Sequence, residues 1–162
     1  AGSFDARIGA AMTRSCVLID KPDHPALAVC EVTSIEELPR VVGAAFQAVG
    51  GHLSSLGEVP AGPPFVGYLS EGPDYEVMIG YPTARELPGA GPVVTCTIPR
   101  GRRAVTMHVG PYDRLGETYD ELMKWVADQG ERPGGPVFEF YLNSPVSSPP
   151  QELQTRIELL LA

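Results

Sequence analysis

The chain has 162 residues, which suits one domain or two small fused units and allows roughly two-thirds of the unfolded surface to be buried. With 43% hydrophobic and 20% charged residues, the composition is that of an ordinary globular protein. The formal net charge of -8 argues against a nucleic-acid surface, which needs clustered Lys and Arg. We therefore expect no direct nucleic-acid partner and a weak long-range attraction for cationic ligands.

The sequence predicts a cytoplasmic protein without a membrane partner. No stretch approaches the ~18 apolar residues of a membrane span, and no secretory signal is present. Cys16, Cys30 and Cys96 are odd in number and lie in strand-like runs, which is typical of buried free thiols in a reduced compartment. Residues 1–11 lack periodicity and are interpreted as an expression scar before a natural start at Met12.

The first half of the chain predicts two strands, a helix and two further strands. Ser34 and Glu37 form a capping box, apolar residues then recur at helical spacing, and the pair at 50–51, Gly-Gly, ends the helix. The expected elements are strands over 16–20 and 28–33, a helix from 34 to 50, and strands over 65–69 and 75–80. Residues 82–92, with Pro and Gly at both ends, are interpreted as a linker.

The second half repeats this order. The expected elements are strands over 93–98 and 104–109, a helix over 112–128, and strands over 138–142 and 155–161. Leu38 aligns with Leu115 at an offset of about 77, and Pro63 with Pro136 at about 73. The sequence thus predicts a duplicated unit, over about 12–81 and 93–162, with a seam on a pseudo-two-fold axis, and such seams are common ligand sites.

Glu139 is the strongest functional signal in the sequence. It lies between Phe138 and Phe140 in an apolar strand, where a charge costs several kcal/mol unless it is paired, hydrogen-bonded or neutralised. The repeat aligns it with Val66, so only the second half carries the acid. Alternation places Glu139 and Tyr141 on one face, which is either the seam between the halves or a solvated face of the sheet.

Other candidates are less specific. Tyr112 begins the second helix, Tyr119 lies on its core stripe and is expected to pack there, and Trp125 lies off that stripe. Glu158 in the last strand is a second candidate acid. The three histidines lack ligand spacing, and no Walker A, Rossmann or G-x-S-x-G motif occurs, so neither a metal nor a cofactor is predicted.

Three segments carry a family resemblance: residues 108–115 (HVGPYDRL), 139–145 (EFYLNSP) and 150–157 (PQELQTRI). Together with the helix that lies between the first two segments and ends at Trp125, they resemble the GyrI-like (gyrase-inhibitor-like) small-molecule-binding family, whose fold also forms the effector-binding domain of bacterial multidrug-responsive activators. The resemblance covers 12–162. It implies an α+β fold in which a duplicated strand-helix-strand-strand unit forms an antiparallel sheet with two helices and a central ligand groove.

The resemblance also implies site residues. In drug-binding members a buried glutamate meets lipophilic cations, and its position resembles Glu139. The aromatic residues that the resemblance implies for the ligand site are Tyr68, Tyr112, Trp125 and Tyr141. Relatives often have an aromatic residue at the position of Glu158, so this acid changes the expected polarity of the pocket. Some stand-alone members resemble hydrolases that open the cyclopropane ring of DNA-alkylating natural products, with Glu139 and Tyr141 as the acid/base pair expected here.

Three functions therefore remain open at this point. The first is a stand-alone binding or resistance protein for flat, hydrophobic, often cationic small molecules. The second is the cyclopropane-opening hydrolase, and the third is an interaction protein that inhibits gyrase. Binding is favoured because it requires fewer correctly placed groups. The sequence contains no helix-turn-helix domain, which argues against a complete transcription regulator, while an excised effector domain stays open as an alternative if Met12 is not the native start.

Overall fold

The computed structural model describes residues 15–162, so the interpretation of residues 1–11 and of Met12 lies outside the described residues. The elements, in chain order, are β2 (Cys16–Lys21), β3 (His24–Ser34), α1 (Leu38–Ser55), β4 (Phe65–Tyr68), β5 (Asp74–Pro82), β6 (Val94–Ile98), β7 (Gly101–Val109), the 3-10 turn η1 (Tyr112–Arg114), α2 (Leu115–Asp128), β8 (Pro133–Tyr141), the 3-10 turn η2 (Pro150–Glu152) and β9 (Gln154–Leu161).

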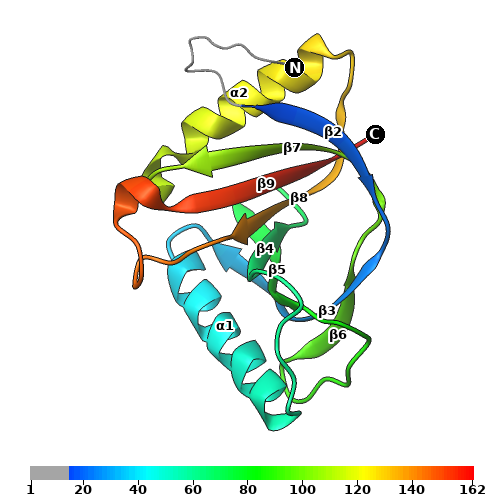
Figure 1. Ribbon diagram of the computed structural model, residues 1–162, viewed down its shortest axis with the longest axis vertical. Coiled ribbons are helices and arrows are strands. Elements are labelled where there is room, and N and C mark those ends of the chain that lie inside the picture. Colours follow the sequence, from blue (N-terminus) through cyan, green and yellow to red (C-terminus); the bar gives the residue numbers. More distant parts are fainter. Residues whose placement is uncertain (1–14) are drawn as a thin grey trace.

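The eight strands of residues 15–162 form one antiparallel sheet in the order β2-β7-β9-β8-β4-β5-β3-β6 (Figure 1). The predicted α+β fold, with two helices on an antiparallel sheet, is confirmed. Strands that correspond in the two halves lie at equal distances from the central β4–β8 pair, and the register there places Val66 opposite Glu139. This arrangement agrees with the aligned repeat, whose exact bounds and pseudo-two-fold symmetry stay predictions.

The sheet is strongly curled, and the connections show why. β2 and β3 lie near opposite ends of the strand order, yet only Pro22 and Asp23 separate them in the chain. Likewise, only two residues join β6 to β7. Since two residues span at most about 7 Å per connection, the sheet must bring its two ends together. The backbone N–H of Arg100 donates to Asp23 Oδ1 at 2.7 Å and joins the two connections.

Both helices pack on the same face of the sheet, which we call the helix face. Val66 contacts the α1 cluster and Ile157 contacts the α2 cluster, and the strand registers place both residues on the same face as Glu139. In Figure 1, α1 and α2 lie toward opposite ends of the long axis of the molecule.

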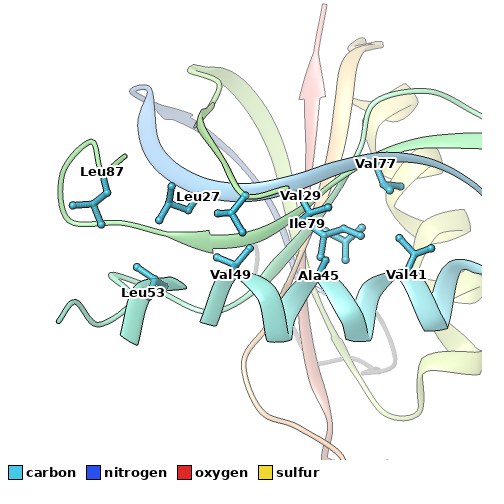
Figure 2. Packing of buried hydrophobic residues seen from close by; sticks show 11 residues of the cluster. Leu27, Val29, Val41, Ala45, Val49, Leu53, Val77, Ile79 and Leu87 are labelled. Carbon is cyan, nitrogen blue, oxygen red and sulfur yellow. The ribbon is translucent and has the colours of Figure 1, made fainter. Parts of the chain in front are cut away.

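The apolar face of α1 covers the strands of the first half. Its buried residues recur every four positions and point toward β3 and β5 (Figure 2). The helix-facing residues are Val41, Ala45, Val49 and Leu53, and their partners include Leu27, Val29, Val77, Ile79 and Leu87. On α2, Leu122 and Val126 are buried in the same way against Ala104, Ile157 and Leu159.

Two predicted boundaries of α1 were wrong. The helix does not end at residues 50–51 but continues to Ser55 and is terminated by Gly57, whose φ of 71° favours glycine. Burial of Leu53, at 2% exposure, outweighs the cost of two internal glycines. At the other end, Ser34 Oγ accepts from the Glu37 N–H at 3.3 Å, but the N-cap is Glu37 and not Ser34.

The physical reason for the later start is Pro39, which is tolerated only in the first helical turn and so fixes where the helix begins. Smaller differences occur elsewhere. Residues 112–114 form a 3-10 turn before α2, and β8 begins at Pro133, within a predicted loop, with a register shift before Val137. Among the helices of residues 15–162, none is long and apolar enough to cross a membrane.

The opposite face of the sheet, which we call the far face, has its own apolar cluster. Phe65, Phe138 and Phe140 pack together there, with ring centroids 5.9 to 6.3 Å apart. Gly67 lies opposite Phe138 in the sheet, and a Cβ at this position would lie 2.5 Å from the Phe138 ring. The absence of a side chain in β4 therefore makes room for an aromatic ring of β8.

We predict that Leu53→Ala lowers the free energy of unfolding by about 2–4 kcal/mol, because it removes a buried side chain from the end of the α1 stripe. Leu56→Ala is the matched control, since Leu56 is 36% exposed at the end of the same helix, and we expect it to cost about 1 kcal/mol or less. Urea unfolding followed by circular dichroism measures both. A loss of unfolding free energy for Leu53→Ala as small as that for Leu56→Ala would show that Leu53 contributes no buried surface.

Candidate functional site

A groove of about 690 Å³ lies on the helix face between α1 and α2, and we call it the helix-side groove. Both halves of the chain contribute to it, with Leu38 and Tyr68 from the first half and Tyr119 and Glu139 from the second. Its lining residues are Ile35, Leu38, Tyr68, Leu69, Ser70, Glu71, Tyr75, Leu115, Gly116, Tyr119, Met123, Pro133, Gly135, Val137, Glu139 and Leu159. The groove has the size of a typical small-molecule pocket.

Glu139 lies at the floor of this groove and is only 5% exposed. Two tyrosine hydroxyls hold its carboxylate. Tyr119, from α2, donates to Oε2, and Tyr141, two residues along the same strand and on the same face, donates to Oε1 at 2.7 Å. The hydrogen bonds replace part of the lost hydration, but no cation is paired with this carboxylate within residues 15–162.

Burial raises the pKa of the Glu139 carboxyl above its usual value, and the hydrogen bonds from Tyr119 and Tyr141 and the field of His108 oppose this shift only in part. Burial and the charge of Glu139 also raise the pKa of both tyrosine hydroxyls far above the usual value. The phenols therefore remain protonated donors at neutral pH. At the floor of the groove, the carboxyl of Glu139 can gain or lose a proton, while the hydroxyls of Tyr119 and Tyr141 stay protonated and donate to it.

Aromatic rings surround this carboxylate. Tyr68 and Tyr75 line the groove and meet edge to face, with ring centroids 6.1 Å apart. Tyr141 is packed between Phe46 of α1, at 6.2 Å, and Tyr112, at 5.9 Å, both also edge to face. These contacts fix the orientation of the Tyr141 ring and so of its hydroxyl.

His108 holds the chain at the start of η1. It is 1% exposed, and its Nε2 donates to the Pro111 carbonyl oxygen at 2.9 Å, while its Nδ1 lies 2.6 Å from Thr118 Oγ1 of α2. Gly110, with φ of 134°, makes the turn between them. This buried histidine, for which the sequence suggested no role, connects the end of β7 to α2 and supports the position of Tyr112.

The structure brings together some of the predicted site residues and separates others. Glu139 and Tyr68 line the groove, and Tyr141 reaches it only through its hydrogen bond to Glu139, since it is not a lining residue. Tyr112 contacts Tyr141, is 37% exposed and does not line the groove either. Trp125 instead packs with the α2 cluster and is not among the residues that line the groove.

Glu158 lies on the far face, away from Glu139. Lys21 Nζ and Arg156 Nε contact its Oε2 at 2.8 and 2.9 Å, and Arg103 Nη1 contacts its Oε1 at 3.2 Å. Burial opposes ionisation of Glu158, but Lys21 and Arg156 outweigh it and hold the pKa of this carboxyl below its usual value. An acid paired in this way is ionised at neutral pH, and its position excludes it from the helix-side groove.

Sequence reasoning missed the role of Tyr119. The residue was expected to pack in the core, and its ring does contact the α2 cluster, but its hydroxyl also reaches Glu139. The helical periodicity of 112–128 could identify its face but not what its polar end would meet. The repeat gives a partial signal, because Tyr119 aligns with Val42 at the offset of 77, so that only the second half carries this hydroxyl as well.

The groove is lined by acidic but not by basic side chains. Its lining includes the carboxyls of Glu71 and Glu139 and no Lys, Arg or His. Within the described part of the chain, no three His, Cys, Asp or Glu side chains are placed to hold a metal ion. None of the three cysteines forms a disulfide, and burial raises the pKa of Cys96 to about 12 and also raises that of Cys30. Neither of these two thiols is an activated nucleophile.

Comparison with solved structures shows the same fold in several proteins. The EcmrR–DNA complex superposes with a TM-score of 0.78 at 18% identity, covering 93% of this chain, which spans only 58% of that one. The C-terminal domain of EcmrR alone gives 0.75 at 18% identity, with 92% and 98% covered. This chain therefore matches the C-terminal part of EcmrR.

Two further structures differ in what they are described to do. A hydrolase encoded by lin2189 from Listeria innocua gives a TM-score of 0.69 at 18% identity, with 93% of each chain covered. SAV2435 bound to tetraphenylphosphonium gives 0.63 at 10% identity, with 91% of this chain and 94% of that one covered. Comparison with curated proteins gave no match.

The sequence itself matches a family profile. The match extends over residues 15–162, which is the whole part of the chain that the structure describes, and includes the groove, Glu139 and both tyrosines that bind it. The family is described as the GyrI-like small molecule binding domain. This chain belongs to the GyrI-like small-molecule-binding family.

Proposed function

We propose that this protein binds hydrophobic, often cationic small molecules in the helix-side groove, with Glu139 as the counter-charge. One observation carries the proposal. Glu139 is a buried carboxyl whose two hydrogen-bond donors are neutral, at the floor of an aromatic groove that has no basic lining residue. A lipophilic cation supplies the charge that this site lacks.

The energetics favour such a ligand over a neutral one. Ionising a carboxyl away from water costs several kcal/mol, and the raised pKa of Glu139 reflects that cost. A cation in contact with the carboxylate recovers part of it. The faces of Tyr68 and Tyr75 add the attraction of aromatic rings for a desolvated cation. Apolar residues such as Leu38 and Met123 would cover the hydrophobic body of the ligand.

One protein of the same fold supports this choice of ligand class. SAV2435 binds tetraphenylphosphonium, a lipophilic cation. For this protein we propose ligand capture, as a xenobiotic-binding or resistance function.

We predict that Glu139→Gln weakens binding of tetraphenylphosphonium by about 1–3 kcal/mol, because the cation loses a desolvated counter-charge. Isothermal titration calorimetry measures the affinity. Glu71→Gln is the matched control, since Glu71 lines the same groove but is exposed, and we expect a loss of less than about 1 kcal/mol. Neutral triphenylphosphine oxide should bind wild type and Glu139→Gln alike. Equal tetraphenylphosphonium affinities for wild type and Glu139→Gln would rule out the counter-charge role.

We also predict a pH dependence of cation binding. The cation favours ionised Glu139, whose pKa is raised in the free protein, so the complex has the lower pKa of the two. Affinity should rise with pH between these two pKa values and level off above the higher one. Binding in that window should release a proton, which calorimetry in two buffers of different ionisation enthalpy detects. A pH profile in Glu139→Gln as steep as in wild type would contradict this assignment.

A second candidate function is hydrolysis of a cyclopropane-bearing electrophile. The observation that favours it is the pairing of one carboxyl with the hydroxyls of Tyr119 and Tyr141 in a groove of small-molecule size. Ionised Glu139 would take a proton from water, whose oxygen bonds to a ring carbon. The carbon–carbon bond then breaks, its electron pair moves into the conjugated carbonyl, and that oxygen takes a proton from Tyr141, which regains one from protonated Glu139 across their 2.7 Å hydrogen bond. The hydrolase from Listeria innocua shares this fold.

For the hydrolytic function, we expect incubation with a cyclopropane-bearing alkylator to give a product heavier by one water, detected by mass spectrometry. Glu139→Gln should abolish this turnover because it removes the base, and Tyr141→Phe should reduce it by about 10²-fold or more as the loss of a general acid. Glu71→Gln should keep wild-type turnover. Absence of product with several such compounds, alongside tight cation binding, would leave binding as the function.

A further inference from the structure

A second pocket, of about 270 Å³, lies on the far face of the sheet, and we call it the far-face pocket. It exists because the curled sheet brings the β2–β3 connection close to the central strands. Pro22 and His24 form one side, Pro63 and Pro82 form another, and Phe140 of β8 also lines it. The helix-side groove and the far-face pocket share no lining residue, since Glu139 and Phe140 are neighbours that point to opposite faces.

The far-face pocket has the opposite charge to the groove. Its lining includes Lys21, Arg103 and Arg156 and no carboxylate. The acid that pairs with them is Glu158, which is 1% exposed and contacts all three cations at 2.8 to 3.2 Å. Three cations and one carboxylate leave a local charge of +2, in a protein whose formal net charge is -8. The overall charge of the protein thus does not predict the charge of this pocket.

The three cations differ in how much of their hydrogen-bonding capacity the protein uses. Arg103 is fully buried and donates to Pro99 and Gly101 carbonyl oxygens as well as to Glu158, so its role is structural. Lys21 and Arg156 are 38% and 29% exposed, and each makes one hydrogen bond, to Glu158, among the described residues. The terminal Nη atoms of Arg156 and further Nζ protons of Lys21 are therefore left to meet solvent or a ligand.

Both cations are also held in place beside an aromatic ring. Arg156 Cζ lies 4.6 Å and Lys21 Nζ 5.6 Å from the centroid of Phe140. These contacts, together with Glu158, fix two long side chains that would otherwise be mobile. A pre-ordered pair of cations loses little further conformational freedom when an anion binds, which is what distinguishes a built site from scattered surface lysines.

We propose that the far-face pocket binds a small organic anion, with one carboxylate or phosphate group on Lys21 and Arg156. The planar guanidinium of Arg156 suits either oxyanion. The apolar part of the ligand would lie against Ile98 and the proline walls of the pocket. This site is separate from the helix-side groove in position and opposite to it in ligand charge, so it stands or falls independently of the cation-binding proposal.

Backbone NMR titration tests the proposal, with benzoate and phenyl phosphate as organic probes, inorganic phosphate to show what the oxyanion contributes alone, and benzamide as the neutral control. We expect saturable shifts at amides of Lys21, His24, Phe140 and Arg156 for at least one organic anion. The probe that binds more tightly shows whether the pocket prefers a carboxylate or a phosphate group. Benzamide should give no saturable shifts there. Equal affinity for benzamide would overturn the proposal, as would shifts spread over the surface without saturation.

Two variants separate the pocket from general charge effects. Lys21→Gln leaves Glu158 paired with Arg103 and Arg156, and should weaken the organic anion about five-fold or more. Lys124→Gln, an exposed lysine of α2 outside the pocket, is the matched control and should leave affinity unchanged. Ala61→Leu places a larger side chain at the wall of the pocket and leaves the residues of the ion cluster unchanged. We expect this variant to abolish binding of the organic anion. Wild-type affinity in both Lys21→Gln and Ala61→Leu would refute the site.

Discussion

The pairing of β4 with β8 is the constraint on which the rest of the structure depends. These strands join the two halves at the centre of the sheet, and their register decides which side chains face the helices. With Val66 opposite Glu139, the helix face receives Glu139 and Tyr141, while Phe138 and Phe140 go to the far face. A shift of one residue would exchange the two sets, turning Glu139 away from the helix-side groove and bringing Phe138 and Phe140 to the helix face.

The chain buries two glutamates in adjacent strands and stabilises them in opposite ways. Glu158 contacts three cations, and its pKa is lowered, so it is a completed ion cluster. Glu139 receives two hydrogen bonds from neutral hydroxyls, and its pKa is raised. The carboxylate of Glu158 therefore has its counter-charges within the protein, whereas Glu139 has none and lies in an open groove. This contrast, rather than burial alone, is why we propose a ligand-binding role for Glu139 and a structural role for Glu158.

The sequence predicted the elements and the central acid because both follow from local patterns. Glu139 stands out between two phenylalanines, and β8 alternates with a period of two. Both patterns can be recognised from neighbouring residues alone. The end of α1 was placed too early, because two glycines signalled a stop while the tertiary contacts of Leu53 decided the outcome.

Contacts between distant segments could not be predicted in this way. Lys21 pairs with Glu158 across 137 positions of sequence, and Tyr119 reaches Glu139 from another element. Glu158 was a second candidate acid because it too lies in an apolar strand. The sequence does not show that Lys21, Arg103 and Arg156 contact it, since the fold of the sheet brings these cations together. Trp125 lies off the predicted stripe of α2, yet packs with the core cluster of that helix, since the N-terminal strand β2 extends the surface that α2 covers.

The strand order also shows that the two halves exchange their edges. β2 is the first strand of the first half but pairs with β7 of the second, and β6 is the first strand of the second half but pairs with β3 of the first. Cutting the chain in the connection between β5 and β6 would therefore leave each fragment with a strand that has no partner. Neither fragment would form a complete sheet by itself, and the two would regain the native topology only by reassembling as a non-covalent pair.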